Sequence, residues 1–210
     1  MNDAAHPSAQ MTDALTGVTT DFHDATARNL LDRWTPLHDW VLRRQDHGVM
    51  PYCKANHGRI GPRGMGSLTD GVPRFGVQFA VQDYLSLASH PAVCEAAYTA
   101  IGERGVHSAG SAALMGLSDL VRQLEARIAA FLGLADATVF PTGWGAGYGA
   151  IRALVRPDDH VVIDVLAHAC LHEGAAAATR NVHRHPHLST EGVERRLSRI
   201  REDCPQAGIL

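Results

Sequence analysis

Lysine is nearly absent from this chain of 210 residues. Lysine and arginine together number 19, and because Lys54 is the single lysine, the other 18 are arginines. A reaction that needs a lysine amine, as nucleophile or as Schiff-base partner, must use Lys54 or a residue outside this chain. Lys54 falls in residues 46–73, a stretch rich in Gly and Pro that predicts a loop.

Other features are missing as well. No apolar run approaches the roughly 20 residues of a membrane-spanning helix, and residues 1–20 have neither the basic start nor the apolar stretch of a secretory signal. The four cysteines include no CxxC pair, which favours free thiols in a reducing cytoplasm. The net charge of -3 implies no basic face for nucleic acid. We therefore expect a cytoplasmic globular protein that binds neither membrane nor nucleic acid.

The chain divides into three expected parts. Residues 1–20 contain few large apolar side chains and predict a disordered leader. Residues 21–73 predict an N-terminal arm, with a helix over 22–45, a kink or break at Pro36, and the loop 46–73. Residues 74–210 predict part of a larger domain.

This third part alternates between strand and helix patterns. Strands are expected within 74–87, where Val77, Phe79 and Val81 alternate, and at 137–141, 161–165 and 181–185. Helices are expected at 91–103, 119–132, 144–154, 169–178 and 191–201, with a small-residue loop at 105–116. This order predicts an α/β domain with a mostly parallel sheet flanked by helices on both faces. Ile209 and Leu210 look like the start of a further strand, so we expect a truncated chain or one piece of a split protein.

The stretch FPTGWG at residues 140–145 carries the first site signal. Gly143 permits a tight strand-to-helix turn, and the helix N-terminus that follows presents free N–H groups to an anion such as phosphate. Thr142 adds a hydroxyl, and Trp144 offers a ring that either covers a flat ligand or fills the core. A plain Gly-rich turn is the alternative.

His168 carries the second signal, because it follows the strand expected at 161–165. Ligands of open α/β sheets bind at the carboxyl ends of the strands, where an imidazole can stack on an aromatic ring or move protons. A surface or capping histidine is the alternative. A run of alternating histidines, His183, His185 and His187, suggests metal binding, but Pro186 interrupts the strand, so we predict no metal site.

Four segments in order resemble the α-oxoamine synthase family across residues 74–174, with weaker similarity to residue 210. They are VQDYLSLASHP, GVHSAGSAALMGLSDLVRQLE, the TGW turn and DVLAHACLHEG. The resemblance implies a fold-type-I, aminotransferase-like large domain and pyridoxal phosphate as cofactor. It also implies a reaction that condenses an amino acid with an acyl-CoA or acyl-carrier-protein thioester, and a homodimer when full length.

The resemblance assigns roles to particular residues. Thr142, Gly143 and Trp144 would hold the cofactor phosphate, and His168 would lie on the pyridine ring and guide substrate protons. Ser111 and Gln82 would lie near the substrate. The family's Schiff-base lysine and its C-terminal small domain have no counterpart in this chain, and Lys54 matches no family lysine, so we expect the chain to be inactive alone.

The chain also departs from the family pattern within the matched segments. Gln82 replaces an asparagine, Val121 a histidine, Ala167 an asparagine or serine, and Cys170 a serine. These changes leave the amino acid and the acyl donor unassigned. Two alternatives stay open: another fold-type-I pyridoxal enzyme such as an aminotransferase, and a catalytically dead partner subunit.

Overall fold

The computed structural model describes residues 16–210 except 23, 69, 107 and 108. Most of the expected leader, residues 1–15, and two residues of the expected loop 105–116 lie outside the described part. The described residues form two compact units, one ending at Val106 and the other running to Leu210. No described helix is long and apolar enough to cross a membrane.

The described part of the first unit contains two short 3-10 helices, Thr19–Asp21 and Asp32–Trp34, followed by the helix α2, Thr35–Asp46. The expected helix over 22–45 is therefore wrong in its first half. There the Asp24 carboxylate accepts the Thr26 N–H at 2.8 Å and the Asn29 side chain accepts the Leu31 N–H at 3.0 Å. Such local side-chain bonds compete with helix formation. Pro36 lies in the first turn of α2 and does not kink it.

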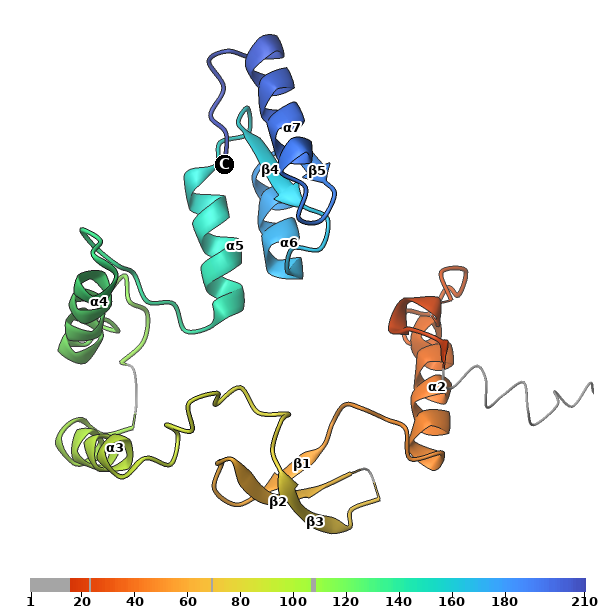
Figure 1. Cartoon of the computed structure of the whole chain (residues 1–210), viewed down its shortest axis with the longest axis vertical. Coiled ribbons are helices and arrows are strands. Elements are labelled where there is room, and N and C mark those ends of the chain that lie inside the picture. Colours follow the sequence, from red (N-terminus) through yellow and green to blue (C-terminus); the bar gives the residue numbers. More distant parts are fainter. Residues whose placement is uncertain (1–15, 23, 69, 107–108) are drawn as a thin grey trace, which may run out of the picture. The chain divides into compact units, whose positions relative to one another are not determined.

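A three-stranded antiparallel sheet follows, with β1 at Ala55–His57, β2 at Arg63–Ser67 and β3 at Pro73–Val77 (Figure 1). The prediction of a loop over 46–73 is wrong at β1 and β2, and the strand expected within 74–87 is confirmed only as far as Val77. In the central register Met65 faces Phe75 and Gly64 faces Gly76. Strands this rich in glycine show little side-chain alternation, so the sequence pattern does not reveal them. The helix α3, Pro91–Arg104, closes the unit, and His90 caps it by accepting the Ala92 N–H.

The second unit contains α4 at Asp119–Leu132, α5 at Gly143–Leu154, β4 at His160–Asp164, α6 at Ala169–Ala178, β5 at Asn181–His185 and α7 at Thr190–Asp203. These elements match the expected ones to within two residues at each end. The strand expected at 137–141 is wrong, because the structure pairs that segment with no other strand of the described chain. One of its amides, Val139 N–H, instead donates to the Glu125 side chain at 3.0 Å.

The strand β4 lies at the centre of the second unit's sheet. It pairs in parallel with β5 on one side, where Val162 faces His183. On its other side it pairs in parallel with the last residues of the chain, through a bridge between His160 and Ile209. Hydrogen bonds from Val162 N–H to the Leu210 oxygen at 2.9 Å and from Leu210 N–H to the His160 oxygen at 3.0 Å support this bridge. The expected strand pattern at residues 209–210 is thus confirmed.

The two faces of this sheet are covered by different helices. Val161 and Ile163 point from β4 into a core with α5 and α6, whose buried members are Ile151, Val155, Ala175 and Ala178. Because side chains alternate along a strand, His160 points to the other face. On that face His160 and His183 line a cleft with residues of α7 that include Ile200. This arrangement confirms the expected α/β layering in the second unit (Figure 1).

Candidate functional site

The turn before α5 leaves backbone N–H groups at the helix N-terminus without a partner in the described chain. Thr142 is the N-cap residue of α5, and its hydroxyl oxygen accepts the Gly145 N–H at 2.9 Å. The Thr142 carbonyl oxygen accepts the Ala146 N–H at 3.0 Å. Neither the Gly143 N–H nor the Trp144 N–H donates to another described residue. A Cβ atom placed on Gly143 would meet nothing within 4 Å. The first turn therefore presents two free N–H groups and a positive dipole end to open space.

His168 begins the neighbouring helix α6. It follows β4 directly and is the N-cap residue of α6, where its Nδ1 atom accepts the Cys170 N–H at 3.2 Å. Its side chain is exposed. The capping role that the sequence left open is therefore real. It leaves the outer edge of the ring, with Nε2, available to a ligand.

The structure brings Trp144 and His168 together. Their ring centroids lie 5.6 Å apart, with an angle of 77° between the ring planes. Trp144 is 45% exposed, so it does not fill the core. Two aromatic side chains thus stand edge to face beside the free N–H groups of α5.

Two glycines allow the helices α5 and α6 to approach closely beside Trp144 and His168. A Cβ atom on Gly147 would lie 2.7 Å from Cys170 Sγ, closer than real Cβ contacts. A Cβ atom on Gly174 would lie 3.1 Å from both the Cα atom and the carbonyl oxygen of Tyr148. The distance between Trp144 and His168 therefore depends on side chains being absent at these two positions.

The site lies at a reversal point in the chain's path through the sheet. From β4 the chain crosses through α6 to β5 on one side, and then through α7 to residues 209–210 on the other side of β4. In open α/β sheets, ligands bind at the carboxyl end of the strand where the strand order reverses. The His168 N-cap follows that end of β4 within four residues.

Asp164 orders the two loops at this edge. Its carboxylate accepts the Leu166 N–H at 2.8 Å and the Leu188 N–H at 3.3 Å, and it lies 3.0 Å from Nδ1 of His187. The backbone N–H of Leu166, followed by His187 and the Leu188 N–H, holds the pKa of Asp164 below its usual range. Asp164 therefore stays ionised near neutral pH. In the sequence, Asp164 is only the first residue of the family-like segment DVLAHACLHEG, and nothing there indicates its partner His187.

The three alternating histidines take three separate partners. His183 Nε2 lies 2.9 Å from His160 Nδ1, His185 Nδ1 approaches the Pro186 carbonyl oxygen at 2.9 Å, and His187 pairs with Asp164. Burial is the main cause that lowers the pKa of His183, and nearby His160 and arginines of α7 add to it. Within the described residues no group of three or more His, Cys, Asp or Glu side chains is placed to hold a metal ion.

The two expected substrate residues, Ser111 and Gln82, belong to different units of the chain. Ser111 belongs to the second unit, where its hydroxyl oxygen accepts the Ala113 N–H at 3.3 Å, and its side chain is exposed. Gln82 is exposed in the first unit. The roles of Ser111 and Gln82 remain predictions.

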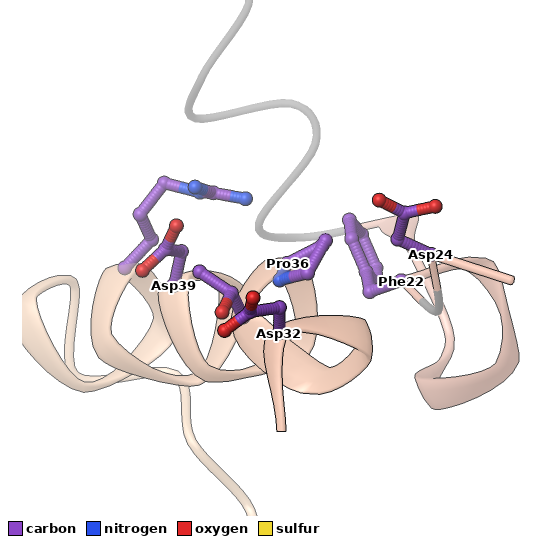
Figure 2. A pocket seen from close by; sticks show the side chains of 7 residues that line it. Phe22, Asp24, Asp32, Pro36 and Asp39 are labelled. Atoms are coloured by element: carbon purple, nitrogen blue, oxygen red, sulfur yellow. The ribbon is translucent and has the colours of Figure 1, made fainter. Parts of the chain in front are cut away.

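A cleft of about 540 Å³ in the first unit is unsuited to a phosphate (Figure 2). It is lined by Phe22, Asp24, Asp32, Thr35, Pro36, Asp39 and Arg43. Three carboxylates against one guanidinium repel an anion. The acidic lining of this cleft therefore does not favour phosphate binding there.

Comparison with known proteins relates the chain to a group of pyridoxal-phosphate enzymes. It is 40% identical over 117 residues to the 8-amino-7-oxononanoate synthase of Granulibacter bethesdensis, and the match covers 56% of this chain and 31% of that protein. It is 40% identical over 145 residues to the same enzyme of Maricaulis maris, and the match covers 69% of this chain and 37% of that protein. No protein-family profile matches. The chain spans about a third of the length of these curated relatives.

Solved structures give the same result for the fold. Sphingomonas wittichii serine palmitoyltransferase superposes with a TM-score of 0.76 at 27% identity, over 86% of this chain and 44% of that one. A serine palmitoyltransferase variant from S. paucimobilis, with a bound PLP–myriocin aldimine, superposes with a TM-score of 0.73 at 24% identity, over 82% of this chain and 42% of that one. The fold is that of fold-type-I pyridoxal-phosphate enzymes, present as an incomplete α/β domain. Over its matched length, the chain is similar to enzymes of the α-oxoamine synthase family.

Proposed function

We propose that the turn at Thr142 and the ring of His168 hold pyridoxal phosphate. The observation that carries this proposal is their joint position: two free N–H groups, an exposed indole and an exposed imidazole in one unit, at the strand-order reversal. The chemistry of these groups fits the cofactor, because N–H donors at a helix N-terminus suit a phosphate and flat rings suit a pyridine.

The protein that carries this chain is, in this proposal, an acyltransferase that condenses an amino acid with an acyl-CoA or acyl-carrier-protein thioester. Bound pyridoxal phosphate supplies the electron sink for the amino acid's carbanion. The chain's own part is to bind the phosphate at Gly143 and Trp144 and to hold the pyridine ring against His168. The same proposal places the protein in the cytoplasm as a homodimer.

The two other candidate functions are weaker. An aminotransferase would use the same phosphate turn, but many aminotransferases place an aromatic side chain where this chain has His168. A catalytically dead partner subunit would need no lysine of its own. Lys54, the sole lysine, lies in the first unit next to β1 and is exposed, and no part is proposed for it in cofactor binding.

The proposal can be tested on the 210-residue chain with a ligand that binds without forming a Schiff base to a lysine. N-(5'-phosphopyridoxyl)-L-alanine, a stable secondary amine, combines the cofactor and an amino acid without needing a Schiff base to the protein. By calorimetry the 210-residue chain should bind it about 10-fold or more tightly than the same compound without phosphate. Charge-assisted hydrogen bonds of about 1.5–3 kcal/mol imply a difference of this size.

Two controls identify the site and the reaction class. Lys54→Ala should bind as the unchanged chain does, and Thr142→Val, which removes the hydroxyl that caps α5, should weaken the preference for phosphate. A non-hydrolysable thioether analogue of an acyl-CoA should bind to the loaded chain more tightly than a 2-oxo acid. Equal affinity with and without phosphate would contradict cofactor binding at this turn, whereas a preference for the 2-oxo acid would favour an aminotransferase.

A further inference from the structure

We propose that Cys170 is a positioning residue that fixes the tautomer and orientation of His168. Cys170 is 5% exposed, and its Sγ atom lies 3.0 Å from His168 Nδ1. The sequence marked this cysteine only as a departure from the serine of related chains. The structure places its thiol on the imidazole that the proposed function puts against the pyridine ring, so the inference rests in part on that proposal.

The direction of the hydrogen bond follows from a second contact. The backbone N–H of Cys170 donates to the same Nδ1 atom at 3.2 Å. A proton on Nδ1 would point at that N–H, so Nδ1 must offer its lone pair. The thiol S–H therefore donates as well, and the two donors of Cys170 share the one lone pair of Nδ1 in a three-centre hydrogen bond.

Two donors on Nδ1 leave the proton of the neutral ring on Nε2. Nε2 is on the outer edge of the exposed ring, away from the cap, so His168 meets a ligand as an N–H donor. The same two contacts resist rotation of the ring and so maintain its edge-to-face contact with Trp144.

The chain keeps Cys170 in this place by tight packing. Gly147 on α5 leaves the space that Sγ occupies, since a Cβ atom there would lie 2.7 Å from Sγ. Sγ therefore lies between the α5 backbone and the imidazole, with little freedom to turn away. A residue with a hydroxyl could occupy the same space and still donate.

Ring-nitrogen NMR of the ligand-free chain tests this inference independently of cofactor binding. Spectra of imidazole-labelled protein at about pH 8.5, where histidine rings are neutral, report the tautomer of His168. Unchanged chain and Cys170→Ser should both show the Nε2–H form with Nδ1 as an acceptor. In Cys170→Ala the ratio of Nδ1–H to Nε2–H should rise about 2–10-fold, as expected for the loss of one neutral hydrogen bond.

The serine and alanine variants separate hydrogen bonding from packing, because both remove the volume of sulfur and only serine donates. Cys204→Ala, at an exposed cysteine after α7, serves as the matched control and should leave the His168 signals unchanged. The inference is overturned if serine and alanine shift the tautomer equally. It is also overturned if the unchanged chain shows a proton on Nδ1, because the ring would then donate to the sulfur instead of accepting from it. Failure of the chain to bind phosphopyridoxyl ligands would affect only the proposed function.

Discussion

Replacing Gly174 by alanine should destabilise the second unit by about 1–3 kcal/mol, the range for forcing an extra group into a packed contact. The new Cβ atom would lie 3.1 Å from the Cα atom and the carbonyl oxygen of Tyr148. Both are backbone atoms, so the clash is relieved only if α5 moves away from α6. Alanine is the better helix former by up to about 1 kcal/mol, and the predicted loss is what remains after that gain. Denaturant unfolding of the two chains measures it.

Gly102→Ala is the matched control, since Gly102 also lies inside a helix, α3. A Cβ atom there would meet nothing within 4 Å. This variant should be neutral or more stable by up to about 1 kcal/mol. If Gly174→Ala were as stable as Gly102→Ala, the close approach of α5 and α6 would not be what positions the site.

Replacing His168 should lower the affinity for N-(5'-phosphopyridoxyl)-L-alanine by about 10-fold or more, because the ligand loses a stacked ring together with its buried area. Alanine would remove both the ring and the cap of α6. Asparagine is a favoured N-cap residue, so His168→Asn should retain the helix start and lose only the ring.

The comparison of these two variants separates stability from binding. Both should bind weakly by calorimetry, while His168→Asn should melt close to the unchanged chain and His168→Ala somewhat lower. A ligand affinity for His168→Asn equal to that of the unchanged chain would show that the imidazole only caps α6.

Much of the second unit is predictable from the sequence, because its helices and strands show both apolar patterns and residues typical of helix ends. Ser118 and Thr142 are N-cap residues, and their hydroxyls accept the Val121 and Gly145 N–H groups. The short apolar run of residues 161–163 marks β4, and Gly143 marks the start of α5. The site residues Thr142, Gly143, Trp144 and His168 follow from these boundaries and from the resemblance to α-oxoamine synthases.

The secondary-structure predictions that are wrong fail for physical reasons. The strand β1 is exposed throughout, and the less exposed positions of β2 are Gly64, Gly66 and Ser67, so neither strand shows apolar alternation in the sequence. Residues 137–141 have the composition of a strand, but a strand also needs a neighbour, and the described chain supplies none. Side-chain caps at Asp24 and Asn29 stop a helix that the apolar spacing predicts.

The partnerships inside the site could not be predicted because they join residues through space. The pairing of Asp164 with His187 spans two loops, and the contact of Cys170 with His168 depends on the side-chain rotamers at the start of α6. The roles of Gly147 and Gly174 become visible only when two helices are packed together.

The most direct test of the central claim is an NMR map of where pyridoxine 5'-phosphate binds to the 210-residue chain. This ligand has the cofactor's ring and phosphate but no aldehyde, so it cannot react with Lys54. The structure predicts the largest changes at the backbone amides of Gly143 and Trp144, the Trp144 indole and the His168 ring. Inorganic phosphate should shift only the two amides. Changes centred instead on Lys54 and the β1–β3 sheet, or none at saturating ligand, would contradict cofactor binding between α5 and α6.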